Sequence, residues 1–166
     1  MSLLWLCLAA VMGIRLLELA YARRNTRRLL AMGGHEVAPG HYPLIVSLHV
    51  AWFAAMALCI RPDHPASLWL LGLFAILQVM RAWAIHSLGP SWTTRIITVP
   101  GAPLVRTGPY RWLHHPNYLV VMGEIATLPA AFGAWRIALA FSLLNASVLA
   151  WRVHCEELAL AARRHR

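Results

Sequence analysis

Five long apolar stretches constrain this sequence more than any other feature. They cover residues 3–21, 42–60, 66–85, 116–134 and 137–153. At 1.5 Å per residue, a helix of about 20 residues crosses the roughly 30 Å of hydrocarbon in a bilayer. None of the stretches alternates apolar and polar residues with a period of two, which argues against membrane-spanning β-strands. The sequence therefore predicts an all-α, polytopic integral membrane protein with about five transmembrane helices, the last two forming a helical hairpin.

The composition excludes two other classes of protein. Hydrophobic residues make up 60% of the 166 residues and charged residues 13%. The charged share is about half that of an average soluble domain, which argues against an ordinary soluble domain. A chain this apolar cannot remain solvated, so a disordered protein is excluded as well.

The three cysteines do not indicate a disulfide framework, because Cys7, Cys59 and Cys155 lie far apart in apolar runs. His154 and Cys155 are neighbours on a helix and point apart, so we expect no metal site there.

The positive charge comes from arginine alone, with fifteen basic residues and a net charge of +9. If the segment after the first stretch faces the cytoplasm, Arg61 and Arg136 fall on the opposite side and ten arginines on the cytoplasmic side. Those ten are Arg23, Arg24, Arg27, Arg28, Arg95, Arg106, Arg111, Arg163, Arg164 and Arg166. Cytoplasmic loops carry such an excess, which predicts an outside N-terminus and a cytoplasmic C-terminus. We assign the charge to topology, and expect no nucleic-acid partner.

The first stretch could also be a cleaved signal peptide, because Ala20-Tyr21-Ala22 fits a cleavage site. A signal peptide begins with a basic region, however, and residues 1–7 contain no basic side chain. Arg15 and Glu18 are three residues apart, so on a helix they share a face and can pair. We therefore expect a retained transmembrane helix.

Residues 86–115 form a long stretch outside the apolar runs, and a loop of this length in a small protein is usually functional. The chain then divides into 1–85, with three N-terminal helices and a basic cytoplasmic loop, and 86–166, with a cofactor-binding loop, helices four and five and the catalytic C-terminal segment. Pro116 suits a first helical turn, whose free N–H groups attract an anion. Aromatic side chains around it, such as Tyr110 and Tyr118, suit a cation. These residues predict a pocket for a zwitterionic ligand.

Ionisable groups at membrane depth mark either function or pairing. Arg152 and Glu156 are four residues apart and share one helix face, where a helix-end salt bridge is the alternative to a functional site. Glu124 would lie two turns into the fourth stretch. A direct substrate role for Glu124 and pairing with Arg152 or Arg81 are both open. His49 is either a ligand-binding residue or a satisfied histidine within the bundle.

Three motifs together resemble the isoprenylcysteine carboxyl methyltransferase family. They are Gly108-Pro109-Tyr110-Arg111, His115-Pro116-Asn117-Tyr118 and Arg152-x-x-x-Glu156-Glu157. That family consists of integral membrane enzymes that use S-adenosylmethionine, so the resemblance implies this cofactor and a methyltransferase activity. Residues 15–25, Gly40-His41-Tyr42-Pro43, His49 and Ser91-Trp92-Thr93-Thr94 resemble a bacterial branch associated with methylating polyketide-derived alkylpyrones or phenolic lipids. The branch implies a place in the bacterial cytoplasmic membrane.

The resemblance also implies roles for single residues. Arg152 falls on the arginine that faces the substrate. The implied cofactor contacts are Ala102, Pro103, Leu104, Val105, Tyr110, His115, Pro116, Asn117, Tyr118 and Glu156. Two features depart from the family. His114-His115-Pro116 stands where the family usually has Arg-His-Pro, and no aromatic tail follows the Glu-Glu motif, so we expect part of the usual cofactor cover to be missing.

Methyl transfer from a sulfonium is an in-line displacement, which depends on alignment and exclusion of water. We expect a lipophilic acceptor to enter sideways from the bilayer, among the membrane lipids, and to present its oxygen near Arg152. A carboxylate needs no base, whereas a phenol or enolic hydroxyl reacts better once its proton is removed. His114 and His115 are near enough to favour a hydroxyl. The predicted catalytic set is Arg152, His115 and Glu124. Carboxyl methylation of an isoprenylcysteine-like substrate, a small transporter and a partner protein stay open as alternatives.

Overall fold

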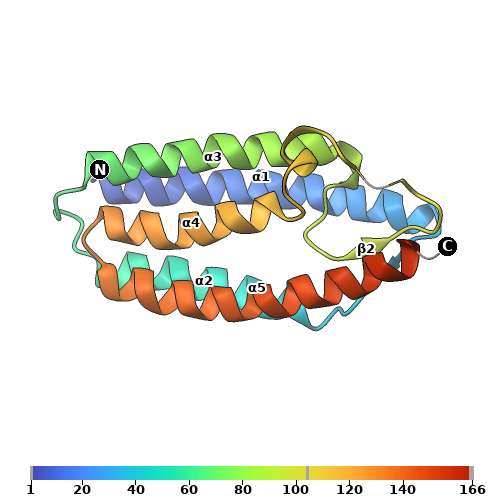
Figure 1. The fold of residues 1–166 in the computed structure, drawn as a ribbon. Helices are drawn as coiled ribbons and strands as arrows, with labels where there is room; N and C mark the ends of the chain where they lie inside the picture. The colour runs from blue at the N-terminus through green and yellow to red at the C-terminus, as the bar shows by residue number, and fades with distance from the viewer. Residues whose placement is uncertain (1, 104, 165–166) are drawn as a thin grey trace.

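Five long helices run side by side in the computed structural model, which describes residues 2–103 and 105–164, with side chains to residue 158 (Figure 1). The helices are α1 (Leu3–Ala31), α2 (His41–Cys59), α3 (Leu68–Leu88), α4 (Pro116–Ala131) and α5 (Trp135–Arg164). A short turn joins α4 to α5, which confirms the predicted hairpin. The all-α architecture of a polytopic membrane protein is confirmed with it.

Within the described residues, four of these helices are long and apolar enough to cross a membrane, namely α1, α2, α3 and α5. α4 has 16 residues, or about 24 Å at 1.5 Å per residue, which is less than the roughly 30 Å of hydrocarbon. The predicted fourth span, 116–134, is therefore longer than the helix that the structure shows, α4 (Pro116–Ala131). The helix ends at Ala131 because the chain reverses at Gly133, which has a φ of +71°. Buried side chains such as Ile125 and Leu128 show that α4 is a core helix packed among its neighbours.

α1 and α5 extend about ten residues past the predicted spans 3–21 and 137–153. Apolar character ends where the lipid would end, but Arg, Leu and Ala are good helix formers, so the helices continue beyond it. The segment 23–28 therefore lies on the last turns of α1 instead of in a loop.

The apolar core fills only one end of the helical bundle. It lies where the N-terminus, the connection from α2 to α3 and the turn from α4 to α5 come together (Figure 1). Its buried members include Leu4, Leu8, Val11, Trp52, Met56, Phe74, Ile125, Leu128 and Phe132. Since this core stops about halfway along the helices, the opposite end of the bundle is free to hold a cavity.

The connections 32–40 and 89–115 and the end of α5 gather at that opposite end (Figure 1). There β1 (His35–Glu36) pairs antiparallel with β2 (Ile97–Thr98), with His35 opposite Thr98. Two short 3-10 helices, η1 (Gly89–Ser91) and η2 (Gly108–Arg111), lie on either side of β2 in the sequence. Asn25 ties α1 to this loop, because its Nδ2 donates to the carbonyl oxygens of Gly89 (3.2 Å) and Trp92 (2.9 Å). As far as the structure describes them, up to residue 164, the segments that carry the predicted cytoplasmic arginines therefore lie at one end.

Gly108 fixes the path of the loop before α4. Its φ is +55°, and a Cβ at this position would lie 2.0 Å from Ser87 Oγ at the end of α3. Thr107 Oγ1 also donates to the Ser87 carbonyl oxygen, at 3.3 Å. Glycine, which has no Cβ, therefore allows the loop to pass close to α3. This close approach holds η2 over the open end of the bundle.

Candidate active site

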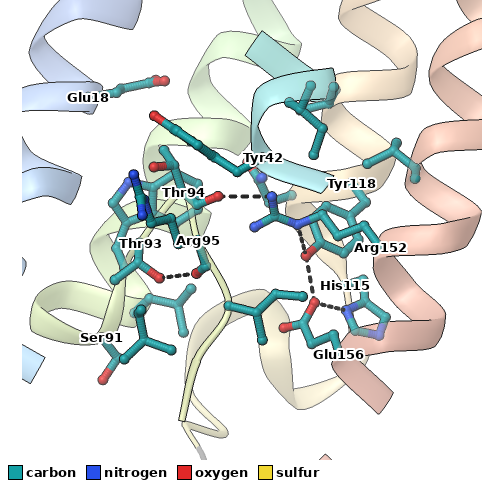
Figure 2. Close-up of a pocket in the computed structure, with 18 of the residues that line it drawn as sticks. Glu18, Tyr42, Ser91, Thr93, Thr94, Arg95, His115, Tyr118, Arg152 and Glu156 are labelled. Atoms are coloured by element: carbon teal, nitrogen blue, oxygen red, sulfur yellow. Dashed lines mark hydrogen bonds and ion pairs between the residues drawn. The ribbon is translucent and has the colours of Figure 1, made fainter. Parts of the chain in front are cut away.

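A cavity of about 1790 Å³ occupies the loop end of the bundle, and Figure 2 shows it in close-up. All five helices and the loop before α4 contribute to its lining. Eight of the ten predicted cofactor contacts line it: Ala102, Pro103, Val105, Tyr110, His115, Asn117, Tyr118 and Glu156. Pro116 is buried in the first turn of α4 and is not among the lining residues. Leu104 lies outside the described residues.

The Tyr118 hydroxyl joins the charged residues of this site (Figure 2). It donates to Glu156 Oε2 at 2.5 Å and accepts from Arg152 Nε at 2.7 Å. Arg152 Nη1 donates to the carbonyl oxygen of Thr94 at 2.9 Å. Arg152 and Glu156 thus share one face of α5, as their spacing predicts, and a phenol from α4 fixes the orientation of both.

His115, the residue before α4, stacks on the Tyr118 ring with centroids 5.1 Å apart and planes 10° apart. Its Nδ1 lies 3.5 Å from Glu156 Oε2, and its Nε2 lies 3.7 Å from Glu157 Oε1. His114 is exposed at the edge of the same cavity. The structure therefore brings together Arg152 and His115, two of the three predicted catalytic residues.

Tyr110 extends into the cavity from η2. Burial raises the pKa of its hydroxyl above the usual range, and the negative charge of Glu156 raises it further. The Tyr110 hydroxyl is therefore neutral at physiological pH and can donate a hydrogen bond.

Two buried polar atoms at the start of α4 have no hydrogen-bond partner among the residues that the structure describes. They are His115 Nε2 and Asn117 Oδ1. Buried polar atoms are normally hydrogen-bonded, so these two fit a site that is completed by a polar ligand. A helix N-terminus favours an anionic group, whereas Asn117 Oδ1 and Glu156 favour a cationic one. The residues present thus fit a zwitterion such as the amino-acid end of S-adenosylmethionine.

Glu124, the third predicted catalytic residue, is placed elsewhere. It is 5% exposed and pairs with Arg15 Nη2 at 2.9 Å and Arg81 Nη1 at 3.3 Å. Gln78 Nε2 donates to it at 2.8 Å. Of the alternatives left open for Glu124, the structure shows the pairing with Arg81, and the contacts described for Glu124 do not include Arg152.

Glu18 completes this second group of charged residues, which joins α1, α3 and α4. Its carboxylate lies 2.6 Å from Arg15 Nη1 and 2.8 Å from Arg81 Nη2, so the predicted pairing of Arg15 with Glu18 is confirmed. Figure 2 shows Glu18 pointing inward from α1, on the side of the cavity away from Arg152. Two arginines face two glutamates, so the group is neutral overall and joins three helices at membrane depth.

Sequence reasoning missed the residues that approach the site from α2 and the loop. The Arg95 guanidinium lies 4.8 Å from the centre of the Tyr42 ring, and Arg95 Nη1 lies 2.7 Å from Glu36 Oε2. Thr94 supplies the carbonyl that holds Arg152. Tyr42 and Thr94 belong to motifs that carry the branch resemblance. The sequence therefore marked these two residues, but it did not predict what they contact.

Comparison with known proteins identifies the family of this chain. A profile of the "Isoprenylcysteine carboxyl methyltransferase (ICMT) family" matches residues 70–162, more than half of the chain. "Uncharacterized protein YpbQ" of Bacillus subtilis (strain 168) is 38% identical over 160 residues, covering 94% of this chain and 95% of that protein. An "Uncharacterized protein" of Haemophilus influenzae is 27% identical over 161 residues, covering 92% of both. No solved structure matches significantly. The chain belongs to the isoprenylcysteine carboxyl methyltransferase family.

Proposed function

We propose that this integral membrane protein is an S-adenosylmethionine-dependent methyltransferase that methylates an oxygen of a lipophilic acceptor. Enzymes of its family generally use this cofactor. The observation that carries the proposal is the hydrogen-bonded group of Arg152, Tyr118 and Glu156 beside two unpartnered buried atoms, all in one large cavity. Such a group can bind a charged ligand and a lipid at the same place.

The start of α4 and the facing turn of α5 would hold the cofactor. The helix N-terminus suits its carboxylate, and Asn117 Oδ1 can accept from its ammonium group. Glu156 can bind the ammonium group or the ribose hydroxyls. The aromatic rings of Tyr110 and Tyr118 can lie against the positive sulfur. S-adenosylmethionine would supply a methyl group on a sulfonium, and the neutral thioether S-adenosylhomocysteine would be the leaving group when the methyl is transferred.

Arg152 is the residue best placed to orient the acceptor. Its Nε and Nη1 are held by Tyr118 and Thr94, while its Nη2 has no hydrogen-bond partner within the described part of the chain. A guanidinium fixed at two of its nitrogens can present the third to an acceptor oxygen with little loss of freedom on binding.

A hydroxyl acceptor has to lose a proton during the reaction. His115 Nε2, which makes no hydrogen bond within the described part of the chain, can take it, and the stacked Tyr118 ring holds the imidazole in place. This atom favours a phenol or an enolic pyrone over a carboxylate, which needs no base. We therefore propose O-methylation of a polyketide-derived alkylpyrone or phenolic lipid, the substrates associated with the bacterial branch.

We also propose that the loop end of the bundle faces the cytoplasm of a bacterium, with the N-terminus outside. The arginine-rich segments lie at the end that holds the cavity, and cytoplasmic segments carry excess arginine. The water-soluble cofactor would then enter from the cytoplasm and the lipid from the bilayer.

Calorimetry on detergent-purified protein tests the cofactor site. We expect S-adenosylhomocysteine to bind the wild type and to bind Glu156→Gln at least about tenfold more weakly, because a charge-assisted contact is lost. Asp63→Asn is the matched control, since Asp63 is exposed, is paired with Arg61 in the connection from α2 to α3, and does not line the cavity. A wild type that binds no S-adenosylhomocysteine contradicts the proposal.

A further inference from the structure

The cavity holds polar side chains at two levels. The first level is the group around Arg152 at the loop end. Deeper in the bundle, the same cavity is lined by Asn145 of α5, His49 of α2 and Arg15 of α1. A cavity that held only a hydrocarbon tail at this depth would be lined by apolar side chains. Arg15 is paired with Glu18 and Glu124, so Asn145 and His49 are the two residues of this level whose place in the lining still needs an explanation.

Asn145 is 2% exposed, and its Nδ2 has no hydrogen-bond partner among the described residues. Asn25 is a useful contrast because it is 4% exposed and its Nδ2 donates to two backbone carbonyls. Asn25 therefore has a structural role that its contacts explain. Asn145 has no such contact, and its unpaired N–H groups border a cavity that can hold a ligand.

His49 supplies the opposite kind of group. Its Nδ1 lies 2.9 Å from the carbonyl oxygen of Ile45. A carbonyl only accepts, so Nδ1 carries the proton and Nε2 of the neutral ring is an acceptor. Within the described part of the chain, no hydrogen bond is made by this Nε2. The deeper level of the cavity therefore offers one N–H donor and one nitrogen acceptor.

The spacing along α5 relates the two levels. Asn145 and Arg152 are seven residues apart, or about 10 Å along the helix, and both line the cavity. Side chains on a helix lean toward its N-terminus, so the long Arg152 side chain leans toward Asn145. A flat head group with two oxygens can therefore present one near Arg152 and the other near Asn145.

We propose that Asn145 and His49 form a second polar subsite, which binds an oxygen of the lipid head group other than the one that is methylated. The inference rests on the proposed function and defines its acceptor class as lipids whose head carries two separated oxygens. A hydroxyl offers both functions that these residues lack, an acceptor for Asn145 Nδ2 and a donor for His49 Nε2. A carbonyl satisfies Asn145 alone.

A pair of lipids that differ by one hydroxyl tests the subsite. The probes are an alkylresorcinol and the alkylphenol with the same chain, each methylated with tritium-labelled S-adenosylmethionine. We expect the wild type to prefer the alkylresorcinol by kcat/KM. Asn145→Leu and His49→Leu should each reduce this preference about tenfold, as expected for the loss of one buried hydrogen bond. An unchanged preference in both variants overturns the inference.

Thermal unfolding of the ligand-free protein separates a binding role from a structural one. Asn145→Leu removes an unpaired buried donor, so it should unfold at the same temperature as the wild type or higher. Asn25→Leu is the matched control and should unfold at a lower temperature, because two carbonyls lose their donor. If Asn145→Leu unfolds as early as Asn25→Leu, Asn145 is structural and the subsite is overturned.

The outcome for the wild type distinguishes the two proposals. If the protein binds no S-adenosylhomocysteine, the proposed function fails and the subsite fails with it. If it binds S-adenosylhomocysteine but methylates neither lipid, the acceptor class is wrong and only the subsite is overturned. Methylation of both lipids with equal kcat/KM also overturns the subsite. In that case the methyltransferase activity itself is supported.

Discussion

At the scale of single residues, the site depends on one phenol. The Tyr118 hydroxyl accepts from Arg152 and donates to Glu156, and its ring stacks on His115. The sequence could predict that Arg152 and Glu156 share a face, because residues four apart on a helix always do. It could not predict the Tyr118 bridge, because that contact depends on how α4 packs against α5.

Tyr118→Phe tests the bridge. The variant keeps the stacked ring but loses both hydrogen bonds to charged groups, so Arg152 and Glu156 lose their fixed orientation. We expect kcat/KM for methyl transfer to fall about a hundredfold, while the protein stays folded. The matched control is Tyr21→Phe, since Tyr21 is exposed on α1 and does not line the site cavity. A loss of less than twofold in Tyr118→Phe would show that the bridge has no part in catalysis.

At the scale of elements, the loop before α4 is positioned by close packing against α3. Gly108 lies so near Ser87 that no side chain fits, and Asn25 of α1 holds the start of the same loop at Gly89 and Trp92. Asn25 and Gly108 belong to motifs visible in the sequence. Their roles were not visible, because Asn25 contacts the loop at Gly89 and Trp92 and Gly108 contacts α3 at Ser87, both distant in the sequence.

Gly108→Ala tests whether this packing positions the cofactor site. The new Cβ would lie 2.0 Å from Ser87 Oγ, so the loop has to move away from α3. We expect S-adenosylhomocysteine to bind at least about tenfold more weakly, with unchanged helical content by circular dichroism. Gly33→Ala is the control, because Gly33 also has a positive φ, of +84°, but has nothing within 4 Å of the new Cβ. If Gly108→Ala and Gly33→Ala weaken binding of S-adenosylhomocysteine equally, backbone strain explains the weaker binding and the packing against α3 does not.

At the scale of the whole molecule, an apolar core at one end and a polar cavity at the other divide the bundle. The length and position of the apolar stretches predicted the helices and the hairpin, and the spacing of Arg15 and Glu18 predicted their pairing. It did not predict that α4 is too short to span, because its length is set by the turn at Gly133. Glu124 was ambiguous in the sequence because its partners come from two other helices.

Glu124→Gln tests the structural role that the geometry gives this residue. The substitution leaves Arg15 and Arg81 facing Glu18 alone, with one buried positive charge uncompensated. We expect the free energy of unfolding in detergent to fall by about 3 kcal/mol, because breaking a buried ion pair leaves a charge without its partner. Asp63→Asn, in an exposed pair, should change it little. Lost methyl transfer at unchanged stability would instead support a direct substrate role for Glu124.

The proposed orientation is tested with fusions to the C-terminus. A fluorescent protein that matures only in the cytoplasm should be bright there, and alkaline phosphatase, which needs an oxidising compartment, should be inactive. The expectation follows from the ten arginines assigned to one side against Arg61 and Arg136 on the other. If the phosphatase fusion is active and the fluorescent fusion is dark, the C-terminus lies outside the cytoplasm and the proposed orientation is wrong.

The most direct measurement of the central claim is methyl transfer itself. Purified protein in detergent is incubated with tritium-labelled S-adenosylmethionine and, in separate reactions, an alkylpyrone, a phenolic lipid and a farnesylated cysteine analogue. We predict label in the organic extract of the alkylpyrone or phenolic lipid reaction, and at least about a hundredfold less with Arg152→Ala. Label in the farnesylated compound alone would contradict the proposed acceptor, and no transfer to any of the three would contradict the account as a whole.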